Sequence, residues 1–225
     1  RRQRQMCIRD SLGIDTVATA ELDLKEAEKP SLWMKRFDRR IGTSGVERLA
    51  VESVYSLAGV TEPGSRMDHV EVIQTLAGLW IKAGQNADIP DLIAEYLRRD
   101  LINKILGNSD NHGRNTAILR SDDRLRLAPI YDLAPMVMDA EGITRTTKWA
   151  SPVERGGEVD WRAACELLNA LVEPDEAFER LRQDARVLLA LPDLLVDSGL
   201  PDAVLDHPAI ALKNLEQRMN GWGLL

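Results

Sequence analysis

The sequence is short of cysteine, histidine and long apolar runs, and each shortage removes a class of protein. Among its 225 residues only Cys7 and Cys165 are cysteines, and neither belongs to a CxxC pair or a Cys/His metal pattern. We therefore expect two reduced thiols in a cytoplasmic protein rather than a disulfide framework or a zinc module. No run of about 18 apolar residues occurs and no hydrophobic signal region stands near the N-terminus, so we expect no membrane span.

The chain also lacks an excess of basic residues. It has 29 Lys and Arg against 36 Asp and Glu, for a formal net charge of -7. Nucleic-acid-binding proteins usually carry the opposite balance, so we expect neither direct nucleic-acid binding nor a membrane partner. With 44% hydrophobic and 29% charged residues, the composition is that of a globular chain able to bury a sizeable core.

Helical periodicity dominates the chain on both sides of residues 107–135. Apolar residues recur at helical spacing in six segments: 47–58, 68–83, 90–106, 160–172, 175–191 and 208–219. Asp68 is a candidate N-cap, with Glu71 three residues later, and Pro90 suits a first helical turn. The remaining segments predict strands at 31–37, 116–120 and 125–128, and loops at 42–45 and 140–158. The predicted fold class is mainly α with a small β component, an α+β arrangement.

The residues with the clearest chemistry stand between 107 and 135. Asp110 is followed five positions later by Asn115, and Asp132 follows a predicted hairpin. Phosphoryl transfer needs a carboxylate that orients the attacking hydroxyl, and hard oxygen ligands for magnesium. Protein kinases supply these groups as D-x-x-x-x-N and then the Asp of D-F-G. The same order occurs here, although Leu133 and Ala134 replace Phe and Gly, and no H-R-D contains Asp110.

Three segments together resemble the HipA-like toxin kinases. They are G-N-S-D-N-H-G-R-N at 107–115, L-A-P-I-Y-D at 127–132, and W-M-K-R-F-D-R at 33–39. These motifs cover about 25 residues, and the similar organisation extends over roughly residues 30–215. The resemblance implies the C-terminal lobe of a serine/threonine protein kinase, with a protein-kinase-like fold and with ATP and Mg²⁺ as cofactors.

The resemblance also implies a role for each matching residue. Asp110 would be the catalytic base, and Asn115 and Asp132 would bind Mg²⁺. His112 would contact phosphate or order its loop, and the backbone at Tyr131 would line the nucleotide. The other residues implied in nucleotide binding are Gly113 and Arg114, through their backbone, and Lys35, Arg36 and Phe37, as the hinge that reads the adenine edge.

For partners, the resemblance implies a protein substrate, for which an aminoacyl-tRNA synthetase is one candidate, and a small DNA-binding antitoxin. Members of the family carry an N-terminal lobe with a phosphate-binding loop, its serine and a lysine, but residues 1–34 contain no Gly-rich loop. We therefore expect the chain to be part of a longer protein and to bind ATP poorly alone. Residues 1–42 would be the junction or hinge segment, and 43–225 the helical C-terminal lobe.

Two other functions remain open from the residues alone. A metal-dependent hydrolase or phosphatase could use Asp110, His112 and Asp132 as ligands, although such sites usually need further ligands. A non-enzymatic helical module for partner binding would leave Asp110, Asn115 and Asp132 unexplained. Binding assays separate these hypotheses, because cation-dependent ATP-analogue binding indicates a kinase and zinc binding without nucleotide indicates a hydrolase.

The remaining polar and aromatic residues are given structural interpretations. The charged segment 38–40 is expected to be a salt-bridged strand end. His69 and His207 stand beside predicted helix starts and are given no role. The five tryptophans are expected in the core or in interfaces.

Overall fold

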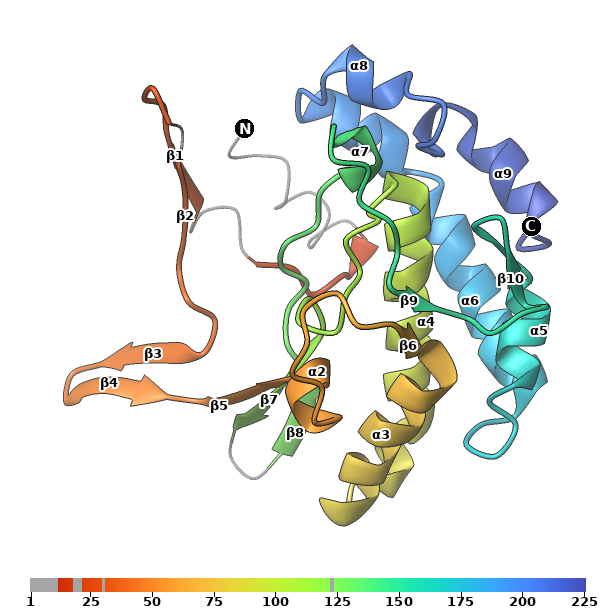
Figure 1. The fold of residues 1–225 in the computed structure, drawn as a ribbon. Coiled ribbons are helices and arrows are strands. Elements are labelled where there is room, and N and C mark those ends of the chain that lie inside the picture. The colour runs from red at the N-terminus through yellow and green to blue at the C-terminus, as the bar shows by residue number, and fades with distance from the viewer. Residues whose placement is uncertain (1–11, 18–21, 30, 122–123) are drawn as a thin grey trace.

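The computed structural model describes residues 12–17, 22–29, 31–121 and 124–225; a helical body carries two β-hairpins that project from it (Figure 1). Helices make up about 41% and strands about 19%, so the fold mixes the two, with helices in the larger share. The helices are α2 (Val54–Leu57), α3 (His69–Lys82), α4 (Ile89–Leu106), α5 (Trp161–Glu166), α6 (Pro174–Leu188), α7 (Leu191–Asp197), α8 (Asp202–Leu205) and α9 (Leu215–Gly221), with 3₁₀ turns η2 (Asn86–Asp88), η3 (Met136–Met138) and η4 (Leu212–Asn214). The strands are β1 (Leu22–Lys25), β2 (Ser31–Met34), β3 (Arg39–Gly42), β4 (Gly45–Arg48), β5 (Ala50–Ser53), β6 (Met67–Asp68), β7 (Ala117–Ser121), β8 (Arg124–Leu127), β9 (Thr147–Lys148), β10 (Glu154–Arg155) and β11 (Glu158–Val159).

Helix α4 is the centre of the helical body and contacts α3 and α6. Its buried face includes Leu97, Leu101 and Ile105, none of which is exposed to solvent. The helix ends at Gly107, whose φ of 63° is the left-handed conformation that glycine adopts without strain. A Cβ at Gly107 would lie 2.6 Å from the Val137 side chain, so packing also requires glycine here. The end of α4 therefore directs the chain sharply into the segment that contains Asp110.

A three-stranded antiparallel sheet, β5-β7-β8, positions the segments on either side of the predicted hairpin. The strands predicted at 116–120 and 125–128 are confirmed as β7 and β8. Ala128 donates its N–H to the carbonyl of Ala117 at 2.8 Å, so the start of β7 and the end of β8 lie side by side. The loop before β7 and the segment after β8 consequently meet at one end of the sheet.

The helix predicted at 47–58 is wrong for most of its length. Residues 45–48 and 50–53 are strands, and only Val54–Leu57 is helical. Val51 pairs with Leu119 across the sheet, which satisfies the backbone of β5 through a distant partner rather than through its own neighbours. The β-branched Val46 and Val51 favour strands, and tertiary pairing prevails over the apparent helical spacing.

The loop predicted at 140–158 is also wrong in its second half. It contains β9, β10 and the first residue of β11, and it buries Thr147, Trp149 and Glu154. β9 forms a short parallel pair with β6, Met67 opposite Thr147. The Gly-, Thr- and Ser-rich composition suggested a surface loop, whereas this segment packs into the molecule.

The remaining predicted elements are confirmed with shifted boundaries. α3 and α4 match the predictions for 68–83 and 90–106, and the Asp68 side chain caps α3 by accepting from the Val70 N–H. The strand predicted at 31–37 ends at Met34, and Gly42 and Gly45 flank the turn of the β3–β4 hairpin. The helix predicted at 160–172 stops at Glu166, and the helices predicted at 175–191 and 208–219 are observed as α6 and as η4 with α9.

Cys165 is a free, buried thiol, and burial raises its pKa to about 12. It is therefore unreactive near neutral pH, in agreement with the expected reduced thiol, while Cys7 lies outside the described residues. Within the described ranges, no helix has both the length and the apolar character needed to cross a membrane.

Candidate functional site

The loop that follows α4 is held in a compact shape by its own polar groups. Asn115 donates its backbone N–H to the His112 carbonyl at 2.9 Å and its side-chain Nδ2 to the Asp110 carbonyl at 2.8 Å. Asp110 donates its backbone N–H to Asn108 Oδ1 at 3.3 Å, and Asn108 Nδ2 donates to Asn103 Oδ1 in α4 at 2.9 Å. The five-residue spacing between Asp110 and Asn115 is thus the span of one closed turn.

His112 lies against the predicted catalytic base. Its Nδ1 accepts the Arg114 N–H at 3.3 Å, and its Nε2 lies 3.4 Å from Asp110 Oδ1. A neutral imidazole that accepts at Nδ1 carries its proton on Nε2, which therefore faces the carboxylate. The interaction orients one oxygen of Asp110 and leaves Oδ2 for a second partner, which is the arrangement that a hydroxyl-activating carboxylate requires.

The two predicted magnesium ligands have features that suit a cation site. The amide nitrogen of Asn115 is used by the Asp110 carbonyl, so its oxygen, the atom that binds cations, is directed to the opposite side of the planar group. Asp132 has a φ of 55°, the one positive value among the described non-glycine residues. Such conformations cost about 1 kcal/mol or more and concentrate at functional sites. One amide oxygen and one carboxylate, together with phosphate and water, are a usual magnesium donor set.

Tyr131 connects the three segments that were predicted to form the site. Its hydroxyl donates to the Arg114 carbonyl in the loop, and its ring stacks on Phe37 with centroids 5.4 Å apart. Burial, and then the neighbouring Asp132 carboxylate, raise the Tyr131 pKa to about 12, so the hydroxyl keeps the proton that it donates. The hinge segment, the loop and the Asp132 segment therefore meet at one aromatic side chain.

The predicted hinge is shaped by a buried carboxylate. Asp38 accepts two hydrogen bonds from Arg36, at 2.8 and 2.7 Å, and is also paired with Arg39. The Arg36 hydrogen bonds lower the Asp38 pKa against the opposing effect of burial. The expected salt bridge is confirmed, but the segment begins β3 rather than ending the strand predicted at 31–37. Because Arg36 is occupied in this way, only its backbone remains for the adenine edge. Lys35 lies on the exposed side of the same segment.

Gly113 fits tightly under a buried ring. A Cβ at this position would lie 2.2 Å from Tyr55 Cδ1 and 3.0 Å from Met67 Sδ. Its carbonyl accepts the Tyr55 backbone N–H at 3.1 Å. The G of the motif is therefore explained by close packing, since no other residue would fit in this space.

Two cavities adjoin these residues. The larger, about 670 Å³, is walled by Tyr131 and Asp132, by the apolar side chains of β2, and by residues of α7 and α8. Its volume lies in the range of small-molecule sites. The smaller, about 50 Å³, lies behind the loop and is lined by Asn111, Asn115 and Tyr131 on one side and by α3 and α4 on the other.

The alternative hydrolase site is not formed. Among residues 12–17, 22–29, 31–121 and 124–225, no group of three or more His, Cys, Asp or Glu side chains is arranged to hold a metal ion. The proposed set of Asp110, His112 and Asp132 would be such a group. Asp110 and His112 contact each other instead, with Nε2 3.4 Å from Oδ1.

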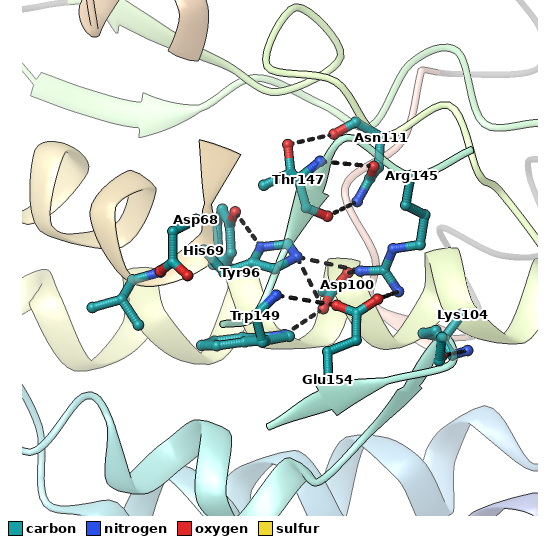
Figure 2. Close-up of polar contacts among 12 residues, drawn as sticks. Asp68, His69, Tyr96, Asp100, Lys104, Asn111, Arg145, Thr147, Trp149 and Glu154 are labelled. Carbon is teal, nitrogen blue, oxygen red and sulfur yellow. Dashed lines mark hydrogen bonds and ion pairs between the residues drawn. The ribbon is translucent and has the colours of Figure 1, made fainter. Parts of the chain in front are cut away.

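Sequence reasoning missed a second set of polar residues, shown in Figure 2. We call it the buried cluster: His69, Tyr96, Asp100, Arg145, Trp149 and Glu154. Asp100 in α4 accepts from Arg145 Nη2 at 2.7 Å and from Trp149 Nε1 at 2.9 Å, and its side chain is only 2% exposed. A sequence signal existed, because Asp100 stands four residues after Tyr96 on the apolar face of a strongly predicted helix. Arg145 and Trp149, by contrast, belong to the segment that was expected to be a surface loop.

His69 in this cluster is neutral. Arg145 Nη2, which can only donate, lies 3.2 Å from His69 Nε2, so Nδ1 carries the proton and donates to the Tyr96 hydroxyl at 2.8 Å. Burial lowers the pKa of His69 more than the Asp100 carboxylate raises it. Its ring stacks on Trp149 with centroids 4.8 Å apart. His69, to which no role was given, thus joins α3 to α4 and to the segment before β10.

Comparison with known proteins places the fold. The chain is similar to HipA of a toxin–antitoxin system of Shewanella oneidensis MR-1, solved in complex with HipB and its operator DNA, at a TM-score of 0.66 and 17% sequence identity. The match covers 98% of this chain and 55% of that one, so the chain spans little more than half the length of that HipA. No curated protein sequence matches the chain. The family model described as the HipA-like C-terminal domain matches residues 4–188, and the chain therefore belongs to this family.

Proposed function

We propose that this domain carries the catalytic residues for ATP- and Mg²⁺-dependent phosphorylation of a serine or threonine on a protein substrate. The observation that carries the proposal is the meeting of three separate motif segments at Tyr131. Its ring contacts Phe37, its hydroxyl binds the Arg114 carbonyl, and its own chain leads into Asp132. Family membership supports the same function, and the proposal assigns the domain to a protein-kinase-like C-terminal lobe.

Each side chain has a stated task in this proposal. Asp110 accepts the proton of the attacking hydroxyl at Oδ2, while His112 Nε2–H holds Oδ1. Asn115 and Asp132 would hold Mg²⁺, which when bound neutralises charge on the phosphates. Lys35, Arg36 and Phe37 would present their backbone to the adenine edge. Gly113 and Arg114 would approach the nucleotide through the backbone, with His112 ordering the loop between them.

The cavity beside Asp132 supports a nucleotide site. Tyr131, Asp132 and the β2 residues Leu32 and Met34 lie on its walls, so an apolar base could enter between the hinge side and the metal side. β2 directly precedes the predicted hinge at 35–37. A base held there would leave its phosphates free to reach Asp132, which lines the same cavity.

Partners belong to the proposal too. The neighbouring HipA was solved with HipB and operator DNA, and we propose that the polypeptide containing this chain has a small DNA-binding antitoxin as partner. The chain itself carries a formal net charge of -7, so DNA contact would come through that partner. An aminoacyl-tRNA synthetase remains the candidate protein substrate from the family resemblance.

The proposal is tested by the cation dependence of nucleotide binding. A fluorescent ATP analogue is titrated into the polypeptide that contains residues 1–225, with Mg²⁺, with Zn²⁺ and with a chelator. We expect Mg²⁺ to increase the affinity for the ATP analogue. Asp132→Asn should reduce this increase by at least about 10-fold, because a charged metal ligand is lost. Asp139→Asn, an exposed carboxylate near the same segment, should behave as the wild type. Binding unaffected by Mg²⁺ in the wild type, or Zn²⁺ binding without nucleotide, would reject the kinase assignment.

A further inference from the structure

The residue beside the proposed base is tied to a distant segment of the chain. Asn111 donates Nδ2 to the Thr147 carbonyl at 2.7 Å, and its Oδ1 accepts the backbone N–H groups of Thr146 at 3.1 Å and Thr147 at 3.3 Å. Thr147 returns a fourth bond from its hydroxyl to the Asn111 carbonyl at 2.8 Å. Figure 2 shows the two residues facing each other next to the buried cluster. The side chain and the backbone carbonyl of Asn111 are thus hydrogen-bonded to residues 146 and 147.

The segment that holds Asn111 is itself held from the other side. Arg145, two residues before Thr147, donates to Asp100 of α4, and Trp149, two residues after it, donates to the same carboxylate. Glu154 accepts the Trp149 backbone N–H at 3.1 Å. Arg145 and Trp149 thus contact α4, while Thr147, which lies between them in the sequence, contacts the loop.

The buried cluster and the loop that contains Asn111 are neighbours in space. The cavity of about 50 Å³ is lined by His69, Asp100 and Thr147 as well as by Asn111 and Asn115. A polar space of this size can hold a water molecule. The buried cluster and the loop are therefore separated by no more than one small cavity.

Asp110 stands between two anchors that depend on α4. On its N-terminal side, Asn108 binds Asn103 of α4 directly. On its C-terminal side, Asn111 binds Thr147, whose segment is fixed to Asp100. Without the second anchor, the turn from Asp110 to Asn115 would be held at its start, at the contact of Gly113 with Tyr55, and at Tyr131.

We propose that Asn111, Thr147 and Asp100 are positioning residues: the Asp100–Arg145–Trp149 contacts fix β9, and Thr147 then holds Asn111 so that the Asp110 carboxylate keeps its direction. This inference rests on the proposed phosphoryl transfer. None of the three residues needs to touch nucleotide or substrate. Their removal should lower kcat and leave the KM for ATP unchanged, because orientation of the base matters in the transition state and not for nucleotide binding.

Paired substitutions at Thr147 test the direct link. Thr147→Val keeps the size of the buried side chain and removes the hydroxyl bond to Asn111, whereas Thr147→Ser keeps the hydroxyl. In the polypeptide containing residues 1–225, we expect Thr147→Val to lower kcat about 5- to 10-fold, the loss of one hydrogen bond, and Thr147→Ser to keep it. Asn111→Ala, which removes three bonds, should lower kcat by about 30-fold or more. Equal kcat values for Asn111→Ala and the wild type, in folded protein, would overturn the proposal.

Amide hydrogen exchange tests the longer link without any activity. Asp100→Asn should accelerate exchange both at residues 145–149 and at residues 108–116, since the first segment holds the second. Asp184→Asn, a half-buried acid on α6 that lies 3.7 Å from Arg98, should accelerate neither. Acceleration in 145–149 alone would reject the coupling. If the wild type transfers no phosphate, the proposed function fails, and the exchange pattern still decides whether Asp100 holds the loop.

Discussion

The molecule has two polar clusters that line the same small cavity. They differ in how much hydrogen-bonding capacity their side chains have left for a ligand. In the loop cluster (Asp110, His112, Asn115, Tyr131 and Asp132), the Asp110 side chain is 30% exposed and only one of its oxygens faces His112. In the buried cluster, Asp100 is 2% exposed and both of its oxygens accept from protein donors. The first cluster retains capacity for a ligand and the second does not. Removing a member should therefore affect mainly chemistry in the loop cluster, whereas in the buried cluster it should lower stability and, through the loop, kcat as well.

The largest expected effect is on phosphoryl transfer in Asp110→Asn. Asparagine keeps the shape of the side chain but cannot accept the hydroxyl proton, so transfer should fall by about 100- to 10,000-fold. The free energy of unfolding should change by less than about 0.5 kcal/mol, as for a partly exposed site. Single-turnover phosphorylation and denaturant unfolding measure the two quantities. Phosphoryl transfer at the wild-type rate in Asp110→Asn would show that Asp110 is not the base.

Asp100→Ala should differ by lowering the free energy of unfolding strongly, in addition to its smaller effect on kcat. It leaves the mostly buried Arg145 with only the longer contact to Glu154, at 3.9 Å, and breaking a buried ion pair costs up to about 3–5 kcal/mol. That is a large part of the 5–15 kcal/mol total that is usual for a domain. Urea unfolding followed by tryptophan fluorescence reports the loss, because Trp149 contacts Asp100 directly.

The matched control for Asp100→Ala is Asp184→Ala. Burial raises the pKa of Asp184, so the folded state does not favour its charged form as it does for Asp100. We expect a loss of less than about 1 kcal/mol. Equal losses at the two positions would mean that the buried cluster is ordinary packing rather than a specific support.

The sequence predicted the loop cluster far better than the buried one. Asp110, Asn115 and Asp132 are close in sequence and are spaced by a turn and a hairpin, whose geometry follows from short-range rules. The contact of Phe37 with Tyr131 could be expected only through the family resemblance, since 94 residues separate them. The roles of the loop residues remain predictions.

The buried cluster depends on long-range contacts that local patterns do not encode. Asp100 and Arg145 are 45 residues apart, and Thr147 meets Asn111 across 36. The β5 strand was mistaken for a helix for the same reason, because its partner β7 begins more than 60 residues later. The helices α3 and α4, whose caps and apolar faces are local, were predicted nearly to the residue.

Gly113→Ala should produce a smaller loss that affects both clusters. The added Cβ would lie 2.2 Å from the rigid Tyr55 ring and must displace either the ring or the loop. Overpacking of this kind costs about 1–3 kcal/mol. Gly78→Ala is the matched control, because it is a helical glycine of α3 with open space around it, and alanine there should stabilise by about 1 kcal/mol. The midpoint temperature of thermal unfolding should therefore fall for Gly113→Ala and rise for Gly78→Ala.

The smallest expected effect is the pH dependence of stability that comes from His69. Burial holds the pKa of His69 below its usual 6.5 in the folded state, with Asp100, Arg145 and Asp68 as the charges around it. Between the folded pKa and about 6.5 the unfolded chain binds the extra proton, so stability falls as the pH drops through this window, by at most about 1.4 kcal/mol per unit. Asp100, whose pKa is held low mainly by Arg145 against the effect of burial, loses its contribution only in more acidic solution. Urea unfolding between pH 7.5 and 5 follows this loss, and a His69 variant identifies the share that comes from His69. His69→Gln should flatten the profile, while His207→Gln should keep it. A wild-type profile already flat across this range would mean that the folded state does not lower the pKa of His69.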